Sequence, residues 1–261
     1  MTNMNYKGKE YYTKVWLRDR KYLTSAHIKY IAMFTMLLSH LAQTGFLYNL
    51  GPDYRTMADI CVFLGRISMP IFCFFTVQAV IYTSNIKKYF IRMFIFALIS
   101  EIPFDLAIHE SLFYINNQNV IFTLLIGALA IYFIDLILKK DINLFIRILG
   151  IILISALSML LASILQTDYE SMGVLAIILI YLAKDSKFLT ALAIIIGFAF
   201  EFAVGGYNIA ISYGFVYLSL PLIMLYNGQR GKQNKWAFYV FYPAHLLIIY
   251  FFETFIYIRK L

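Results

Sequence analysis

The chain has 261 residues, of which 62% are hydrophobic and 14% charged. Soluble domains average about 45–50% apolar and about 25% charged residues, which excludes a soluble enzyme, a disordered chain and a small disulfide-stabilised module. The formal net charge is +8, and the basic residues lie between apolar runs. This pattern is typical of a protein oriented in a lipid bilayer, so we expect no nucleic-acid partner.

The first 26 residues are polar and basic and precede the first apolar run. We expect residues 1–26 to form a cytoplasmic tail, because this stretch is long for the basic region of a signal peptide. A short amphipathic patch in it is suited to the membrane surface; its residues are Tyr11, Tyr12, Val15 and Trp16. Residues 27–261 are expected to form a single membrane domain.

Nine apolar runs follow, at residues 28–50, 60–82, 89–108, 119–138, 144–165, 171–183, 188–204, 210–226 and 236–258. About 20 apolar residues cross a bilayer as a helix, and backbone groups in lipid must be paired within the segment. The strands of a membrane barrel would alternate apolar and polar residues, which these runs do not. The sequence therefore predicts an all-α, polytopic membrane helix bundle with about nine transmembrane helices. Eight or ten remain alternatives, because the runs at 171–183, 188–204 and 210–226 are short.

The loops between these runs alternate between basic and acidic residues along the chain. Because basic loops stay on the cytoplasmic side, this alternation predicts a cytoplasmic N-terminus. Arg259 and Lys260 are a misfit, since nine crossings would place them outside.

His40 lies 12 residues into the first run, about 18 Å along a helix and therefore past the midplane. Ionisable groups at this depth are costly and mark functional sites. A neutral imidazole can transfer protons or accept an acyl group. The alternative is a core histidine that is hydrogen-bonded between helices.

Arg66 lies in the second run, and Glu101 and Asp105 lie in the third. Arg66 is suited to hold a carboxylate or stabilise an oxyanion, or else to form a structural ion pair with Glu101. Spacing of four places Glu101 and Asp105 on one helix face. Glu101 is a candidate base or partner of His40, whereas simple solvation at the membrane boundary accounts for Asp105.

His245 lies nine residues into the last run, just after Pro243. We expect the proline to break the helix, and irregular backbone at membrane depth is tolerated only where it is buried or lines a cavity. The sequence therefore predicts that His40 and His245 face one cavity. The alternative is that His245 only caps the helix break.

Basic residues in the predicted cytoplasmic loops are candidates for binding phosphates, although membrane orientation explains them equally well. They are Lys87, Lys88, Arg92, Lys139, Arg147, Arg230 and Lys232. The sequence contains no Walker loop, dinucleotide fingerprint, zinc-ligand spacing or nucleophile elbow. We therefore predict no metal site and no ATP-driven pump.

Several short sequence motifs, taken together and in their order along the chain, resemble those of the TraX family. This family is named for a conjugal-transfer protein that N-acetylates pilin. The resemblance runs from about Lys29 to Tyr250. Its motifs are Gly65-Arg66-Ile67-Ser68-Met69-Pro70, Ser84-Asn85-Ile86-Lys87-Lys88 with Arg92, Ser100-Glu101-Ile102-Pro103-Phe104-Asp105, Asn119-Val120-Ile121-Phe122-Thr123, Leu225-Tyr226-Asn227-Gly228 with Arg230-Gly231, and Phe241-Tyr242-Pro243-Ala244-His245.

This resemblance implies a multi-pass acyltransferase-like fold in a bacterial cell membrane, with acetyl-CoA as co-substrate from the cytoplasm. It implies that His40 is the catalytic histidine and that Arg66, Glu101 and His245 match other polar positions of the site. The acetyl-CoA phosphates would meet Lys87, Lys88, Arg92 and Arg230. The acceptor would be an amine or hydroxyl at the outer side, on a peptide or a glycan.

The sequence departs from the family pattern at two places. Ser39 stands where the family usually has Asp before the histidine, and Gln78 and Ala79 replace an acidic residue and Gly. These departures leave open that the acceptor has changed or that the site has lost its activity.

Other functions remain alternatives to an acetyltransferase that modifies a peptide. One is a permease, or an accessory or immunity factor for a secreted peptide. Another is an O-acyltransferase that acts on lipid or cell-wall glycan.

Overall fold

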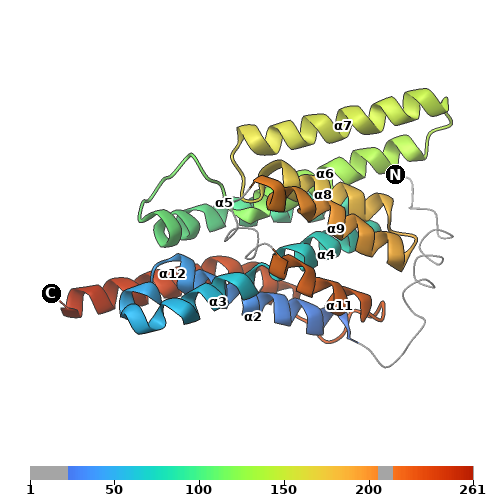
Figure 1. Cartoon of the computed structure of the whole chain (residues 1–261). Helices are drawn as coiled ribbons and strands as arrows, with labels where there is room; N and C mark the ends of the chain where they lie inside the picture. The colour runs from blue at the N-terminus through green and yellow to red at the C-terminus, as the bar shows by residue number, and fades with distance from the viewer. Residues whose placement is uncertain (1–22, 205–213, 261) are drawn as a thin grey trace.

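The computed structural model describes residues 23–204 and 214–260, and within them the chain is all-helical apart from two isolated β-bridges. Figure 1 shows the arrangement. The α-helices are α2 (Ser25–Gln43), α3 (Arg55–Gly65), α4 (Ser68–Tyr82), α5 (Ile86–His109), α6 (Val120–Leu138), α7 (Leu144–Ile164), α8 (Glu170–Leu182), α9 (Lys187–Val204), α11 (Ser219–Met224) and α12 (Lys235–Lys260). Three 3-10 helices join them, at Tyr48–Leu50, Pro52–Tyr54 and Phe215–Leu218. The predicted amphipathic patch of the tail lies outside the described residues.

Every predicted apolar run contains a helix, which confirms the prediction of a helical membrane protein. Four stretches of the described chain are long and apolar enough to cross a bilayer, namely Pro52–Tyr82, Val120–Leu138, Leu144–Ile164 and Trp236–Phe255. Three further apolar helices are shorter, at Glu170–Leu182, Lys187–Ala199 and Phe215–Met224. The count of nine crossings stays a prediction.

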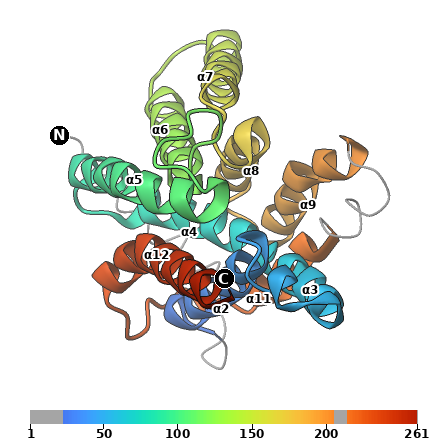
Figure 2. The same ribbon diagram turned by 90° about the vertical axis from the view of Figure 1, so that its left-hand side faces the viewer.

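Helix α4 lies at the centre of the bundle and packs against α2, α6, α8 and α11 (Figure 2). Twelve of its 15 residues are buried, which fits a helix that is apolar on all faces. In contrast, α7 lies at the periphery, and Ala162 is its one buried residue. Most of the interior polar groups described below lie on α2, α4, α5, α6 and α12, which contact one another within the bundle.

A glycine permits the closest helix contact near the predicted site. A Cβ atom on Gly65 would lie 2.0 Å from the Cβ of Ser39, so only glycine lets α3 approach α2 this closely. The chain then turns at Arg66 and Ile67, and the Ser68 hydroxyl donates to the Gly65 carbonyl at 2.7 Å. The predicted single helix over 60–82 is therefore two helices, and Arg66 lies at their junction.

Pro103 and Pro243 both lie inside continuous helices. Helix α5 runs through Pro103, and α12 runs through Pro243. The predicted break before His245 is therefore wrong. A proline removes only one backbone donor, and the helix on either side of Pro243 continues.

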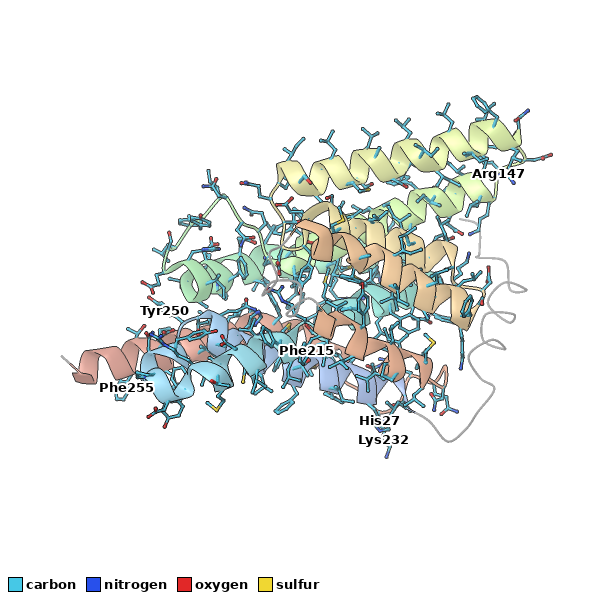
Figure 3. The ribbon with its side chains drawn as sticks, viewed as in Figure 1. His27, Arg147, Phe215, Lys232, Tyr250 and Phe255 are labelled. Carbon is cyan, nitrogen blue, oxygen red and sulfur yellow. The ribbon has the colours of Figure 1, made fainter. Side chains whose placement is uncertain are left out.

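The two ends of the bundle differ in charge. His27, Arg147 and Lys232 lie toward one end, here called the basic end, and Tyr250 and Phe255 lie toward the opposite end (Figure 3). At the basic end, the entry to α2 is tied to the loop before α12. Leu23 donates its N–H to Leu225 at 3.0 Å, and Ser25 and Ala26 donate theirs to the carbonyls of Gln229 and Arg230 at 2.9 and 3.1 Å.

Candidate functional site

The two predicted membrane histidines contact each other, although 205 residues separate them in sequence. Nδ1 of His40, on α2, lies 2.6 Å from Nε2 of His245, on α12. The rings stack with their centroids 4.9 Å apart. On its other side, Nδ1 of His245 lies 2.7 Å from the carbonyl oxygen of Phe241. The sequence predicts that His40 and His245 face one cavity; the structure places them in direct contact with each other, and neither lines the cavity described below.

Tyr242 joins this pair to the surrounding polar groups. Its buried ring meets the His40 ring at 6.1 Å and the His245 ring at 5.8 Å, both edge to face. The charges of Asp168 and Glu101 both act on its hydroxyl. Tyr242 thus connects the histidines with carboxylates from two other parts of the chain.

Glu101 is held by the start of α6. Its Oε2 accepts the Asn119 backbone N–H at 3.4 Å and also the Asn119 side-chain amide. Asn119 in turn caps α6 by accepting the Ile121 N–H at 3.0 Å. Oε1 of Glu101 is buried and has no hydrogen-bond partner among the described residues. The contacts expected between Glu101 and either His40 or Arg66 are not among its hydrogen bonds or ion pairs.

Arg66 instead faces the connection between α7 and α8. It donates to the Tyr169 hydroxyl at 3.3 Å, and its guanidinium lies 5.9 Å from the centre of the Tyr169 ring. Burial raises the pKa of Asp168 to about 6, while the Arg66 charge opposes the rise. The sequence predicts neither Asp168 nor Tyr169 as a site residue. We call His40, Arg66, Glu101, Asp168 and His245 the polar cluster.

Asp105 is not simply solvated, as had been expected. It is buried and accepts the Tyr114 backbone N–H at 2.8 Å. The loop after α5 begins at Glu110, which has a positive φ of 52°, and this hydrogen bond anchors the loop. The role of Asp105 in the described structure is therefore to shape the opposite end of the bundle.

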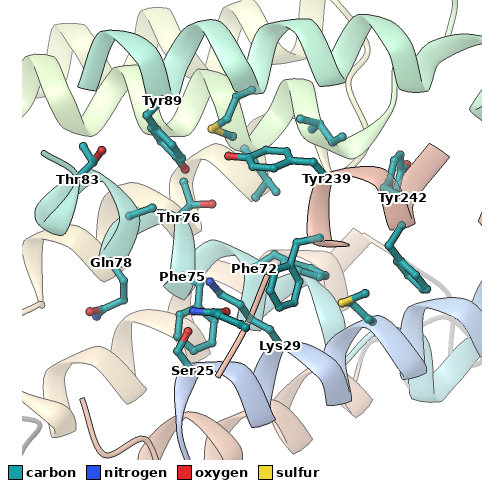
Figure 4. Close-up of a pocket in the computed structure, with 18 of the residues that line it drawn as sticks. Ser25, Lys29, Phe72, Phe75, Thr76, Gln78, Thr83, Tyr89, Tyr239 and Tyr242 are labelled. Carbon is teal, nitrogen blue, oxygen red and sulfur yellow. The ribbon is translucent and has the colours of Figure 1, made fainter. Parts of the chain in front are cut away.

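A cavity of about 580 Å³ lies between α2, α4, α5, α6 and α12, next to the loop that precedes α12. Figure 4 shows Ser25 and Thr83 toward one end of it and Tyr242 toward the other. None of its lining residues is an aspartate or a glutamate. Because Tyr242 lines the cavity and also touches both histidines, the inner end of the cavity lies one side chain away from the histidine pair.

Three cations line this cavity, namely Lys29, Arg92 and Arg230. The Lys29 ammonium lies 4.8 Å from the centre of the Phe75 ring, and the Arg92 guanidinium lies 5.2 Å from that of Tyr239. None of the three forms an ion pair within the described chain. Cations that meet only aromatic faces keep their capacity to bind an anion.

The predicted phosphate-binding residues divide into two groups. Arg92 and Arg230 line the cavity, whereas Lys87 and Lys88 are exposed and do not. Sequence reasoning missed Lys29, whose signal was a lysine just inside the first apolar run with no acidic neighbour four residues away. Among the described residues, no group of three histidine, cysteine or acidic side chains is placed to hold a metal ion.

The residues at which the sequence departs from the family pattern have distinct positions. Ser39 is buried against Gly65 and accepts a hydrogen bond from the Gln43 amide at 2.7 Å. Gln78 and Ala79 line the cavity. Ser39 thus lies where α2 packs against α3, whereas Gln78 and Ala79 lie in the wall of the cavity.

Comparison with known proteins gives one family and one named relative. A family model described as TraX protein matches residues 24–253. The chain is 27% identical over 240 residues to the probable fimbrial assembly protein FimC, serogroup H1, of Dichelobacter nodosus, a match that covers 85% of this chain and 92% of that protein. No solved structure matches the chain. The polar cluster and the three cations of the cavity all lie inside the region matched by the family model.

Proposed function

This chain belongs to the TraX family, and from that membership and the geometry of the site we propose that it is an integral-membrane acetyltransferase. It takes an acetyl group from acetyl-CoA at the basic end of the bundle. It delivers that group to an amine or hydroxyl at the opposite side of a bacterial cell membrane.

This proposal is supported mainly by the cavity, which is lined by cations and is separated from the histidine pair by Tyr242. Lys29, Arg92 and Arg230 provide positive charge without a lining carboxylate, which suits the phosphates of coenzyme A. Tyr242 closes the inner end and touches both histidines. A long ligand with an anionic head and a reactive thioester tail fits this arrangement.

Membrane orientation supports the same direction of transfer. Arg147 and Lys232 lie at the basic end, and basic loops favour the cytoplasmic side, where acetyl-CoA is present. The histidine pair then lies deeper in the membrane, on the way to the outer side. This order matches a reaction whose donor and acceptor are on different sides.

His40 is the residue that we assign to the chemistry, as an acetyl carrier. Its imidazole attacks the thioester carbonyl, and an acyl-imidazole is reactive enough to pass the acetyl group on. Arg66 would stabilise negative charge that develops on the acyl oxygen. Glu101, fixed by Asn119, would hold the start of α6 beside Tyr242 and orient the acceptor.

The relative from Dichelobacter nodosus carries a name that refers to fimbrial assembly. This favours a protein subunit of a surface filament as the acceptor over a lipid or a glycan. The acceptor group would then be an amine or a hydroxyl of that subunit that reaches the polar cluster.

The test uses the purified full-length protein in nanodiscs with acetyl-labelled acetyl-CoA. We expect CoA release and label on the protein in the wild type, and neither in His40→Ala. His109→Ala is the matched control, because His109 lies outside the histidine pair and bonds to Asn117. The absence of CoA binding in folded wild-type protein would refute the proposal and favour a permease or an accessory factor.

A further inference from the structure

The histidine pair belongs to a chain of hydrogen bonds with a defined direction. The Phe241 carbonyl, the His245 ring and the His40 ring follow one another, with contacts of 2.7 and 2.6 Å. A carbonyl oxygen can only accept a hydrogen bond. The first contact therefore requires that Nδ1 of His245 carries a proton.

This requirement fixes the protons of the second contact. In a neutral imidazole one nitrogen donates and the other accepts, so Nε2 of His245 must be the acceptor. Nδ1 of His40 is then the donor in the 2.6 Å contact. The remaining nitrogen of His40, Nε2, carries the free lone pair and has no hydrogen-bond partner among the described residues.

We infer that His245 is a positioning residue that holds His40 in the Nδ1–H tautomer, so that Nε2 of His40 is the nucleophilic nitrogen. The inference rests on the proposed function for its catalytic meaning, but the tautomer itself follows from the hydrogen bonds. The arrangement is comparable in logic to a catalytic triad, in which a buried acceptor fixes the tautomer of a histidine. Here a backbone carbonyl and a second imidazole take the place of the carboxylate.

The backbone of α12 makes the arrangement rigid. Phe241 and His245 are four residues apart on the same helix, so their contact needs no other element. The helix continues through Pro243, and His245 is buried while His40 is partly exposed. The more deeply buried member of the pair thus sets the geometry of the more exposed one.

The proposed reaction uses this tautomer as follows. Nε2 of His40 bonds to the thioester carbonyl carbon, the carbon–sulfur bond breaks, and coenzyme A leaves as a thiolate. The positive charge on the acetylated ring is stabilised because its Nδ1–H still donates to His245. The acceptor then attacks the carbonyl carbon and the bond to Nε2 breaks. The proton that the acceptor loses balances the one that the thiolate gains.

The first test reads the tautomer directly. The chain has four histidines, so selective ¹⁵N labelling in nanodiscs gives a simple spectrum that single substitutions can assign. We expect the His40 signals of a protonated Nδ1 and an unprotonated Nε2. A protonated Nε2 on His40 in the wild type would overturn the inference, whether or not acetyl transfer is observed.

The second test separates positioning from packing with two substitutions of His245. In His245→Gln, the amide oxygen replaces Nε2 as the acceptor, so we expect the same His40 tautomer and a kcat within about tenfold of wild type. His245→Leu fills the space without an acceptor, and we expect mixed tautomers and a kcat at least about 100-fold lower. The KM for acetyl-CoA should stay within about threefold in both, because His245 does not line the cavity.

The control and the opposing outcomes are also defined. His109→Gln removes a histidine outside the pair and should change neither the His40 spectrum nor kcat. An equal loss of activity in the Gln and Leu variants, or full activity in the Leu variant, would refute a positioning role. If the tautomers behave as expected but no acetyl transfer occurs in the wild type, the proposed function fails and the hydrogen-bond inference stands.

Discussion

The cavity and the polar cluster lie next to each other, but their charged and polar side chains make different kinds of contact. In the cavity, Lys29 and Arg92 meet aromatic rings, and no carboxylate lines the walls. In the cluster, His40, Glu101 and Arg66 each have a hydrogen-bond partner within the chain. The cations of the cavity are thus left able to bind an anion, whereas the polar groups of the cluster are bonded to other side chains and backbone groups of the chain.

The largest effect is expected for His40→Ala, which should separate the chemistry of the polar cluster from ligand binding in the cavity. We expect acetyl transfer to fall by about 10³-fold or more, because both nucleophile and base are removed. Affinity for coenzyme A should remain within about twofold, because His40 does not line the cavity. Isothermal titration and CoA-release assays on the same samples check both quantities. Equal losses of binding and transfer would show that the two regions are not separate.

Lys29→Met combined with Arg92→Met should have the converse effect. Charge-assisted hydrogen bonds contribute about 1.5–3 kcal/mol each, so the loss of two is expected to lower the affinity for coenzyme A by about 10²–10⁴-fold. The rate at saturating acetyl-CoA should stay within about threefold. Titrations at low and high salt provide the check, since the salt dependence of binding should also decrease. Unchanged affinity would contradict the assignment of the cavity.

A pH effect is expected from Asp168. Burial raises the pKa of its carboxyl to about 6 from the ordinary 3.8, so the folded protein binds this proton more tightly than the unfolded chain. The resulting stabilisation is complete below the ordinary pKa and is lost as the pH rises through about 6. Its size is on the order of 1–2 kcal/mol, because the side chain is partly exposed.

Asp168→Asn should remove this dependence. We expect the melting temperature of the wild type in detergent to fall more between about pH 5 and pH 7 than that of the variant. Thermal melts of both proteins across this range provide the measurement. Parallel curves would show that Asp168 keeps an ordinary pKa and that its partial burial beside Arg66 does not affect its ionisation.

The smallest effect is expected for Lys87→Met combined with Lys88→Met. Both side chains are exposed and lie outside the cavity, so affinity for coenzyme A should change by no more than about twofold. This variant removes the same number of charges as the Lys29 and Arg92 double variant and is its matched control. A tenfold loss would mean that the phosphates extend beyond the cavity to these lysines.

Much of the fold was predictable because lipid imposes simple rules. The apolar runs had to be helices, and each contains one in the described structure. The interior position of His40 and His245 was also predictable, since ionisable groups at membrane depth face the bundle interior, but their direct contact was not. The family resemblance covered both positions, and the family match bears it out.

The contacts between distant helices could not be read from spacing along the chain. Residue spacing gives depth in the membrane, but it does not say which way a helix face is turned. The sequence therefore offered Glu101 as one alternative partner of Arg66, whereas in the structure Arg66 donates to the Tyr169 hydroxyl. The turn at Arg66 is marked by Pro70, which lies in the first turn of α4, where proline is tolerated. The close contact that requires Gly65 could not be read from the sequence, because it involves Ser39 on another helix.

The tie between the entry to α2 and the loop before α12 has a consequence for biosynthesis. Leu23 bonds to Leu225 and Asn227, residues that a ribosome adds roughly 200 residues, or about 10–40 s, after Leu23 itself. The backbone groups of Leu23, just before α2, therefore lack these partners until nearly the whole chain has been synthesised. Gly228 and Arg230, which line the cavity, can join Ser25 and Lys29 only then, so the cavity is completed late in the synthesis of the chain.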